Sequence, residues 1–76
     1  MNKKYNEVFL EVFEIKEDEL DDLKYQSIPS WDSVGHMTLI SGLEEKFNIM
    51  MEMDDIIDFE SYKKGKEIMN KYGVNL

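Results

Sequence analysis

Apolar side chains in this chain recur at helical spacing, and this periodicity limits the fold more than any other feature. Residues 3–15 (KKYNEVFLEVFEI) place apolar side chains on one helical face and glutamates on the other, which predicts an amphipathic helix. Residues 33–48 predict a second helix despite two internal glycines, Gly35 and Gly42, which also allow a neighbouring segment to approach closely. The apolar face of this second helix consists of Leu39, Ile40, Leu43 and Phe47.

The C-terminal third of the chain predicts two more helices. Residues 54–60 (DDIIDFE) are long enough for only a short one. Ser61 is suited to cap a last helix over residues 62–72, and Gly73 follows as a C-terminal glycine cap should. The expected apolar contacts of the two helices are Ile56, Ile57 and Phe59, then Tyr62, Ile68, Met69 and Tyr72.

Residues 16–32 (KEDELDDLKYQSIPSWD) break the helical pattern with clustered acids, serines and the only proline. Leu20, Leu23 and Ile28 are expected to hold this long loop on the core, with a short helical turn near residues 18–23. We therefore predict an all-α fold for a single domain over residues 1–76. It is a small four-helix bundle with three longer helices, a short third helix and a long loop between the first two.

Composition excludes several classes of protein. The chain has no cysteine, so disulfides and cysteine-based zinc sites are excluded, and no apolar run approaches the roughly 20 residues of a membrane span. The net charge of −8 is concentrated in residues 17–60, where Lys24 and Lys46 are the only basic residues. Such a surface repels nucleic acid and anionic lipid and attracts basic proteins. We expect a cytoplasmic protein with no membrane insertion.

Asp32, Ser33 and His36 supply the residue types of a hydrolase triad within five positions. Ser33 and His36 are three residues apart, so contact between them on one helix is feasible. However, the sequence has no Gly-x-Ser-x-Gly elbow and no evident oxyanion hole. We therefore predict a protein that is not an enzyme and has no catalytic residues.

The acidic runs also fail as metal sites. An EF-hand loop needs oxygen ligands at its first, third and fifth positions. Counting from Asp18 places Leu20 third, and counting from Asp54 places Ile56 third. With one histidine in the chain, we predict no metal site.

Ser33 has two possible roles at the start of the second helix. Asp32-Ser33 is an ordinary capping arrangement, which local spacing alone favours. The second role is attachment of a phosphate-bearing group, because a helix N-terminus stabilises a phosphate through unpaired N–H groups and its dipole.

The segment around Ser33 resembles a known family. WDSVGHMTLISGLEEKFNI is similar to the second helix of acyl carrier proteins, and DDIIDFESY resembles their short third helix and the turn into the fourth. The resemblance covers essentially the whole chain in order. It implies that Ser33 bears a covalent 4′-phosphopantetheine arm, that Asp32 belongs to the recognition motif, and that the arm carries acyl groups as thioesters.

The resemblance also implies partners. A phosphopantetheinyl transferase would attach the arm and an acyl-loading ligase or synthase would charge it. A downstream acyl transferase or ketosynthase with a basic docking surface would use the product. Glu44 and Glu45 match acids with which the family meets such surfaces, and the carrier is expected to be a monomer.

This chain departs from the common carrier pattern directly after Ser33. Val34 replaces the usual leucine, Gly35, His36 and Thr38 replace further acids, and Trp31 adds an aromatic before the motif. We interpret Val34, His36, Met37 and Thr38 as partner-binding residues. Met37 is expected on the exposed side and His36 on the helix surface near the arm.

These departures predict a dedicated pathway, such as surface-sugar acylation or secondary metabolism, and not the bulk fatty-acid supply. Two alternatives stay open. One is an aminoacyl carrier, either D-alanyl or peptidyl, and the other is an acidic interaction domain that is never modified.

Overall fold

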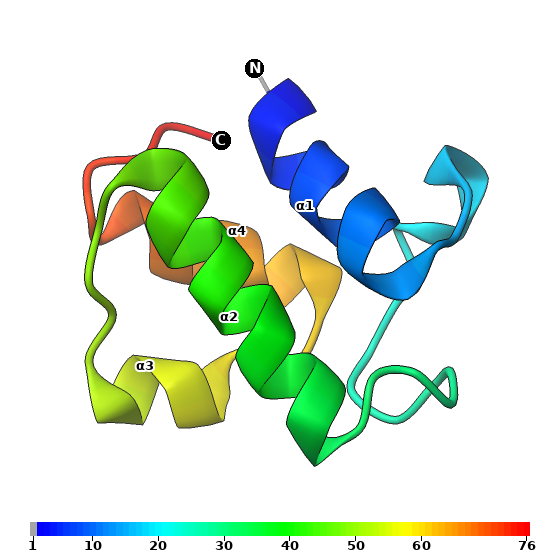
Figure 1. The fold of residues 1–76 in the computed structure, drawn as a ribbon. Coiled ribbons are helices and arrows are strands. Elements are labelled where there is room, and N and C mark those ends of the chain that lie inside the picture. The colour runs from blue at the N-terminus through cyan, green and yellow to red at the C-terminus, as the bar shows by residue number, and fades with distance from the viewer. Residues whose placement is uncertain (1) are drawn as a thin grey trace.

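The computed structural model describes residues 2–76, and its regular structure is helical (Figure 1). Within these residues there is no β-strand, only an isolated bridge between Lys24 and Ser61. None of the helices in this part of the chain has the length and apolarity of a membrane span. The predicted all-α class is confirmed. The elements in chain order are α1 (Lys3–Phe13), the short 3₁₀ helix η1 (Glu17–Glu19), α2 (Ser33–Phe47), α3 (Met53–Asp58) and α4 (Tyr62–Asn70).

α1 packs against α2 (Figure 1). The core that they share with the rest of the chain is rich in aromatic rings. Phe9 of α1 is fully buried, and its ring centroid lies 5.8 Å from that of Trp31 and 6.3 Å from that of Phe59. Burial of such large side chains gives a short chain a substantial apolar core. The other aromatic neighbours of Phe9 are Tyr5, Phe13 and Tyr62.

The predicted helices α1, α2 and α4 are present, and local geometry sets their ends. α1 stops at Phe13 because Glu14 adopts a left-handed conformation, with φ of 55°. α2 stops at Phe47, where Asn48 does the same. The N-cap role of Ser61 is confirmed, since its Oγ accepts a hydrogen bond from the Lys64 N–H at 2.9 Å.

Gly73 ends the C-terminal helical segment as predicted, three residues beyond the last residue of α4. Its φ is +83°, a conformation that favours glycine. Its N–H donates to the Asn70 carbonyl, and the next N–H, of Val74, donates to the Met69 carbonyl. This pair of bonds is the Schellman arrangement, which satisfies the last helical carbonyls.

The loop between α1 and α2 is held on the core. Leu20 and Leu23 are buried and Ile28 is half-buried, as predicted. The Tyr25 N–H donates to the Glu60 carbonyl at 2.8 Å, so the loop also pairs with the segment before α4. Trp31, noted in the sequence only as a neighbour of the motif, is fully buried. The chain therefore enters α2 from a fixed position.

α3 is short, as predicted, but it buries a different set of side chains. Phe59 is buried and Ile56 half-buried, whereas Ile57 is 66% exposed, so its prediction as a core contact is wrong. Adjacent residues point about 100° apart on a helix, and in α3 the packed side includes Ile56 and leaves Ile57 outside. Asp55 is buried instead, and its carboxylate accepts hydrogen bonds from the Lys71 ammonium at 2.6 Å and the Tyr72 hydroxyl at 2.5 Å.

Candidate functional site

Asp32, and not Ser33, caps α2. The Asp32 carboxylate accepts a hydrogen bond from the Gly35 N–H at 2.8 Å, and the Asp32 carbonyl accepts the His36 N–H at 2.7 Å. Ser33 is the first helical residue and its side chain is exposed. Because Asp32 does the capping, the Ser33 hydroxyl is not needed to hold the helix end.

Gly35 fixes the way in which the loop meets α2. A Cβ at this position would lie 1.9 Å from the Ser30 carbonyl oxygen, so only glycine lets the preceding turn cross the helix so closely. Gly42 similarly lets α1 approach α2, since a Cβ there would lie 2.9 Å from Val8 Cγ1. The close approach expected at both glycines is confirmed.

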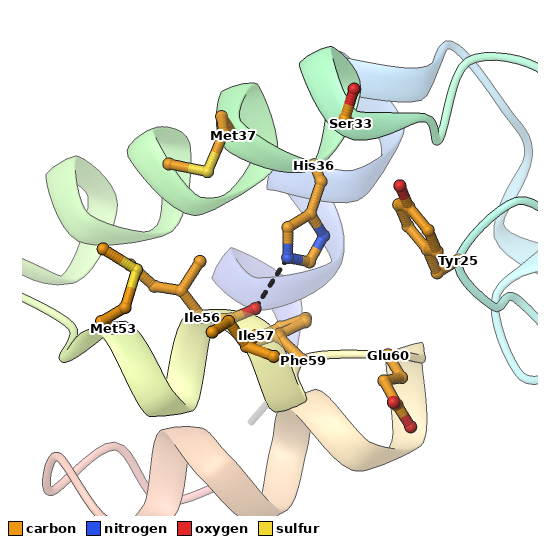
Figure 2. A pocket seen from close by; sticks show the side chains of 9 residues that line it. All are labelled: Tyr25, Ser33, His36, Met37, Met53, Ile56, Ile57, Phe59 and Glu60. Atoms are coloured by element: carbon orange, nitrogen blue, oxygen red, sulfur yellow. Dashed lines mark hydrogen bonds between the residues drawn. The ribbon is translucent and has the colours of Figure 1, made fainter.

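An apolar groove of about 420 Å³ opens beside Ser33, between α2, α3 and the loop at Tyr25 (Figure 2). Figure 2 shows side chains of α2 and α3 on its two sides. Its outer part is formed by exposed flexible side chains, with Met37 50% exposed and Met53 69% exposed. The volume is within the range of small-molecule sites. The lining residues are Tyr25, Ser33, His36, Met37, Met53, Ile56, Ile57, Phe59 and Glu60.

His36 is half-buried between α2 and α3. The expectation that it lies on the helix surface is therefore wrong. The ring Nδ1 lies 3.0 Å from Trp31 Nε1. Nε2 lies 2.8 Å from the Ile56 carbonyl oxygen, and Figure 2 shows this second contact as a dashed line. Since both ring nitrogens are engaged and Asp32 caps the helix, these residues do not form a triad with Ser33.

The other predicted partner-binding residues of α2 gather on its outer side. Val34 is 74% exposed, and Met37 is exposed as predicted. Thr38 is exposed too, and its hydroxyl donates to the Val34 carbonyl at 3.0 Å. A shallow hollow lined by Ser33, Val34, Met37, Thr38 and Ser41 runs along this side. The structure thus brings these predicted residues together with Ser33.

The acidic pair on α2 lies apart from this group. Glu44 and Glu45 are eleven and twelve residues beyond Ser33, which corresponds to roughly 16–18 Å along the helix. Glu45 is exposed, whereas Glu44 is half-buried and accepts a hydrogen bond from the Met51 N–H at 2.9 Å. Glu44 therefore holds the link between α2 and α3, and Glu45 is the more accessible of the two.

Sequence reasoning did not place Tyr25, Met53 or Glu60 in the site. It expected three further lining residues only as apolar contacts of the third helix: Ile56, Ile57 and Phe59. The available signal was the methionine-rich stretch NIMMEM at residues 48–53, which has no helical periodicity. Apolar side chains without a periodic face often lie on a binding surface, and flexible methionines suit such a surface.

No group of three or more metal-ligand side chains occurs within residues 2–76. The chain matches none of the protein-family models, none of the curated proteins and none of the solved structures with which it was compared. The functional argument therefore rests on the residues around Ser33.

Proposed function

We propose that this protein is an acyl carrier, with a small four-helix bundle of the carrier type and a 4′-phosphopantetheine arm on Ser33. One observation carries the proposal. The Ser33 hydroxyl is exposed beside an apolar groove, and it is not needed as a cap because Asp32 caps the helix. The family resemblance of the surrounding sequence points to the same hydroxyl.

The residues at the start of α2 fit a phosphodiester on Ser33. Asp32 uses the Gly35 N–H, which leaves the earlier first-turn N–H groups and the positive end of the helix dipole for a phosphate. The attached arm would end in a thiol, which holds a carried group as a thioester. A transferase would supply the base that accepts the Ser33 proton, because both nitrogens of His36 are already engaged.

The chemistry of the groove favours an acyl cargo over an aminoacyl one. Its walls are thioether, aliphatic and aromatic groups from Met37, Met53 and Phe59, among others. The Glu60 carboxylate turns away from these side chains (Figure 2). An apolar chain gains free energy by leaving water for such walls, whereas a charged amino group gains little.

The surface around Ser33 suits proteins that combine apolar and basic groups. Val34 and Ile57 present exposed apolar area, while exposed acids lie farther along α2, at Glu45, and on α3, at Asp54 and Asp58. We propose that the phosphopantetheinyl transferase, a loading ligase or synthase and a downstream acyl transferase or ketosynthase dock here. The pathway would be a dedicated one and the carrier a cytoplasmic monomer without enzymatic activity of its own.

The test is attachment of the arm. The full-length protein is incubated with coenzyme A and a broad-specificity phosphopantetheinyl transferase, and its intact mass is recorded. We expect a gain equal to one phosphopantetheine group in the natural protein and none in Ser33→Ala. Ser41→Ala is the matched control, because Ser41 is another exposed serine of the same helix and should not affect the gain.

Two outcomes would contradict the proposal. No gain in the natural protein would favour an acidic interaction domain that is never modified. A gain that persists in Ser33→Ala would move the attachment site to another residue. If the arm is present on protein from its native cell, mass spectrometry of the carried group then separates an acyl from an aminoacyl carrier.

A further inference from the structure

The imidazole of His36 connects three parts of the molecule that are separate in the sequence. It belongs to α2, bonds to Trp31 at the end of the preceding loop, and reaches the Ile56 carbonyl within α3. The planes of the Trp31 and His36 rings are inclined by only 16°, which suits an in-plane N–H···N bond. A single side chain thus bridges the loop and both walls of the groove.

These bonds fix the tautomer of His36. An indole nitrogen is only a donor, so the Trp31 N–H must donate and His36 Nδ1 must accept without a proton of its own. In a neutral imidazole the proton then resides on Nε2, which donates to the Ile56 carbonyl oxygen at 2.8 Å. One tautomer satisfies both partners, and the other satisfies neither.

The surroundings leave Trp31 dependent on this ring, whereas the Ile56 carbonyl also accepts the Phe59 N–H at 3.4 Å. Trp31 is fully buried, and no buried side-chain nitrogen or oxygen within the described residues lacks a hydrogen-bond partner. Without His36 the indole N–H would be buried and unpaired, which is costly. The ring is also packed, with Tyr25 at 5.6 Å and Phe59 at 6.4 Å between ring centroids.

α3 depends on contacts outside itself. It has six residues, too few for a helix to be stable alone, and Ile57 makes little use of the core. On the side of α4 it is held by Asp55, which bonds to Lys71 and Tyr72. On the side of the groove the hydrogen bond to the main chain of α3 comes from His36.

We propose that His36 is a positioning residue, fixed as the neutral Nε2–H tautomer, that holds α3 against the start of α2 and so keeps the groove beside Ser33 narrow. Its two hydrogen bonds divide this task. The bond to Trp31 orients the ring, and the bond to Ile56 restrains α3. The inference concerns the groove itself and does not depend on whether Ser33 bears an arm.

The test uses the full-length, unmodified protein labelled with nitrogen-15. Imidazole nitrogen shifts should report one neutral tautomer, with an unprotonated Nδ1. His36→Asn can place an acceptor near the position of Nδ1 but cannot reach Ile56, whereas His36→Gln can place a donor near the position of Nε2. The two variants therefore separate the two hydrogen bonds.

We expect each variant to speed hydrogen exchange at one of the two partners of His36 and to leave the other partner protected. In His36→Asn the amides of residues 56–59 should exchange about tenfold faster, the effect of losing one hydrogen bond, while the indole N–H of Trp31 stays protected. In His36→Gln the indole should exchange faster and α3 should stay protected. The neutral apolar dye N-phenyl-1-naphthylamine should bind more strongly to His36→Asn than to the natural protein.

The inference is wrong if the imidazole shifts show the Nδ1–H tautomer or an average of both. It is also wrong if both variants give the same pattern, or if α1 and α4 lose protection together with α3, since that would indicate general destabilisation. Should neither variant fold, the imidazole spectrum of the natural protein decides alone. The experiment uses protein without an arm. A negative result would therefore not contradict the proposed carrier function, and a negative result in the arm-attachment test would not contradict the role of His36.

Discussion

Asp32 combines a hydrogen-bond acceptor and a negative charge at the start of α2, and substitution separates the two properties. Asp32→Ala removes the bond to the Gly35 N–H and should lower the free energy of unfolding by about 1 kcal/mol. Asp32→Asn keeps an acceptor of equal capping strength and should leave stability nearly unchanged. Urea denaturation of the three proteins at pH 7 measures both effects.

The same pair tests the recognition role proposed for Asp32. If a transferase reads the carboxylate charge, Asp32→Asn should acquire the phosphopantetheine arm more slowly than the natural protein while remaining equally stable. Equal rates of modification would restrict Asp32 to capping. An equal loss of stability in both variants would show that the cap bond contributes less than the charge at the helix N-terminus.

At the residue scale, local features were predictable and distant partners were not. The cap at the start of α2 was predicted because capping depends on neighbouring positions, and the structure assigns it to Asp32. The role of His36 was missed because its partners, Trp31 and Ile56, are brought to it by the tertiary fold. Helical spacing gives the direction of a side chain but not the segment that it will meet.

At the element scale, the position of α3 depends on the ionisation of Asp55. Hydrogen bonds from Lys71, and then from Tyr72, hold the pKa of the Asp55 carboxyl below its ordinary value. A carboxyl with a lowered pKa stabilises the fold at pH values above the unfolded pKa of about 3.9. This stability is lost as the pH falls through the lower pKa of the folded state.

Asp55→Asn should therefore be less stable than the natural protein at pH 7, and the difference should shrink below about pH 4. Denaturation across a pH series measures this convergence. Asp58→Asn is the matched control, because Asp58 is an exposed aspartate of the same helix without a bond to Lys71 or Tyr72, so its substitution should not lower stability at pH 7. A difference that stays constant down to pH 2 would mean that Asp55 contributes by packing and not by charge.

The elements themselves were largely predictable because periodicity and caps are local. α1, α2 and α4 lie within two residues of their predicted ends, and α1 and α2 end early because Glu14 and Asn48 adopt left-handed conformations. α3 was located but its buried face was not. A helix of six residues has too few turns for its apolar residues to define a side, so the exposure of Ile57 and the burial of Asp55 could not be predicted.

At the scale of the whole molecule, the groove arises from the way in which α3 lies against α2, and no short segment encodes this. Its lining comes from the loop at Tyr25, from α2 and from residues 53–60, which the sequence separates widely. The charge distribution, by contrast, could be read directly from the sequence. It leads to a prediction about the stability of the entire fold.

A net charge of −8 on a molecule of 28 × 25 × 18 Å should make stability depend on ionic strength. The Debye length is about 30 Å at 0.01 M salt and about 8 Å at 0.15 M. At low salt the carboxylates therefore repel one another across the whole molecule, and at 0.15 M the repulsion is mostly screened. Salt also weakens attractive pairs such as Glu7–Lys46, at 3.6 Å, but exposed pairs contribute less than about 1 kcal/mol.

We therefore expect the melting temperature to rise between 0.01 and 0.15 M sodium chloride, by about 4–8 °C for each 1 kcal/mol of repulsion removed.

Asp58 lies at the C-terminal end of α3, four residues after Asp54, so its negative charge is destabilised both by the helix dipole and by the like charge of Asp54. Asp58→Asn should thus raise the melting temperature at low salt and reduce its salt dependence. Millimolar magnesium should also raise the melting temperature of the natural protein. A melting temperature that falls on adding either salt would show that attractive ion pairs outweigh the repulsion among the acidic residues.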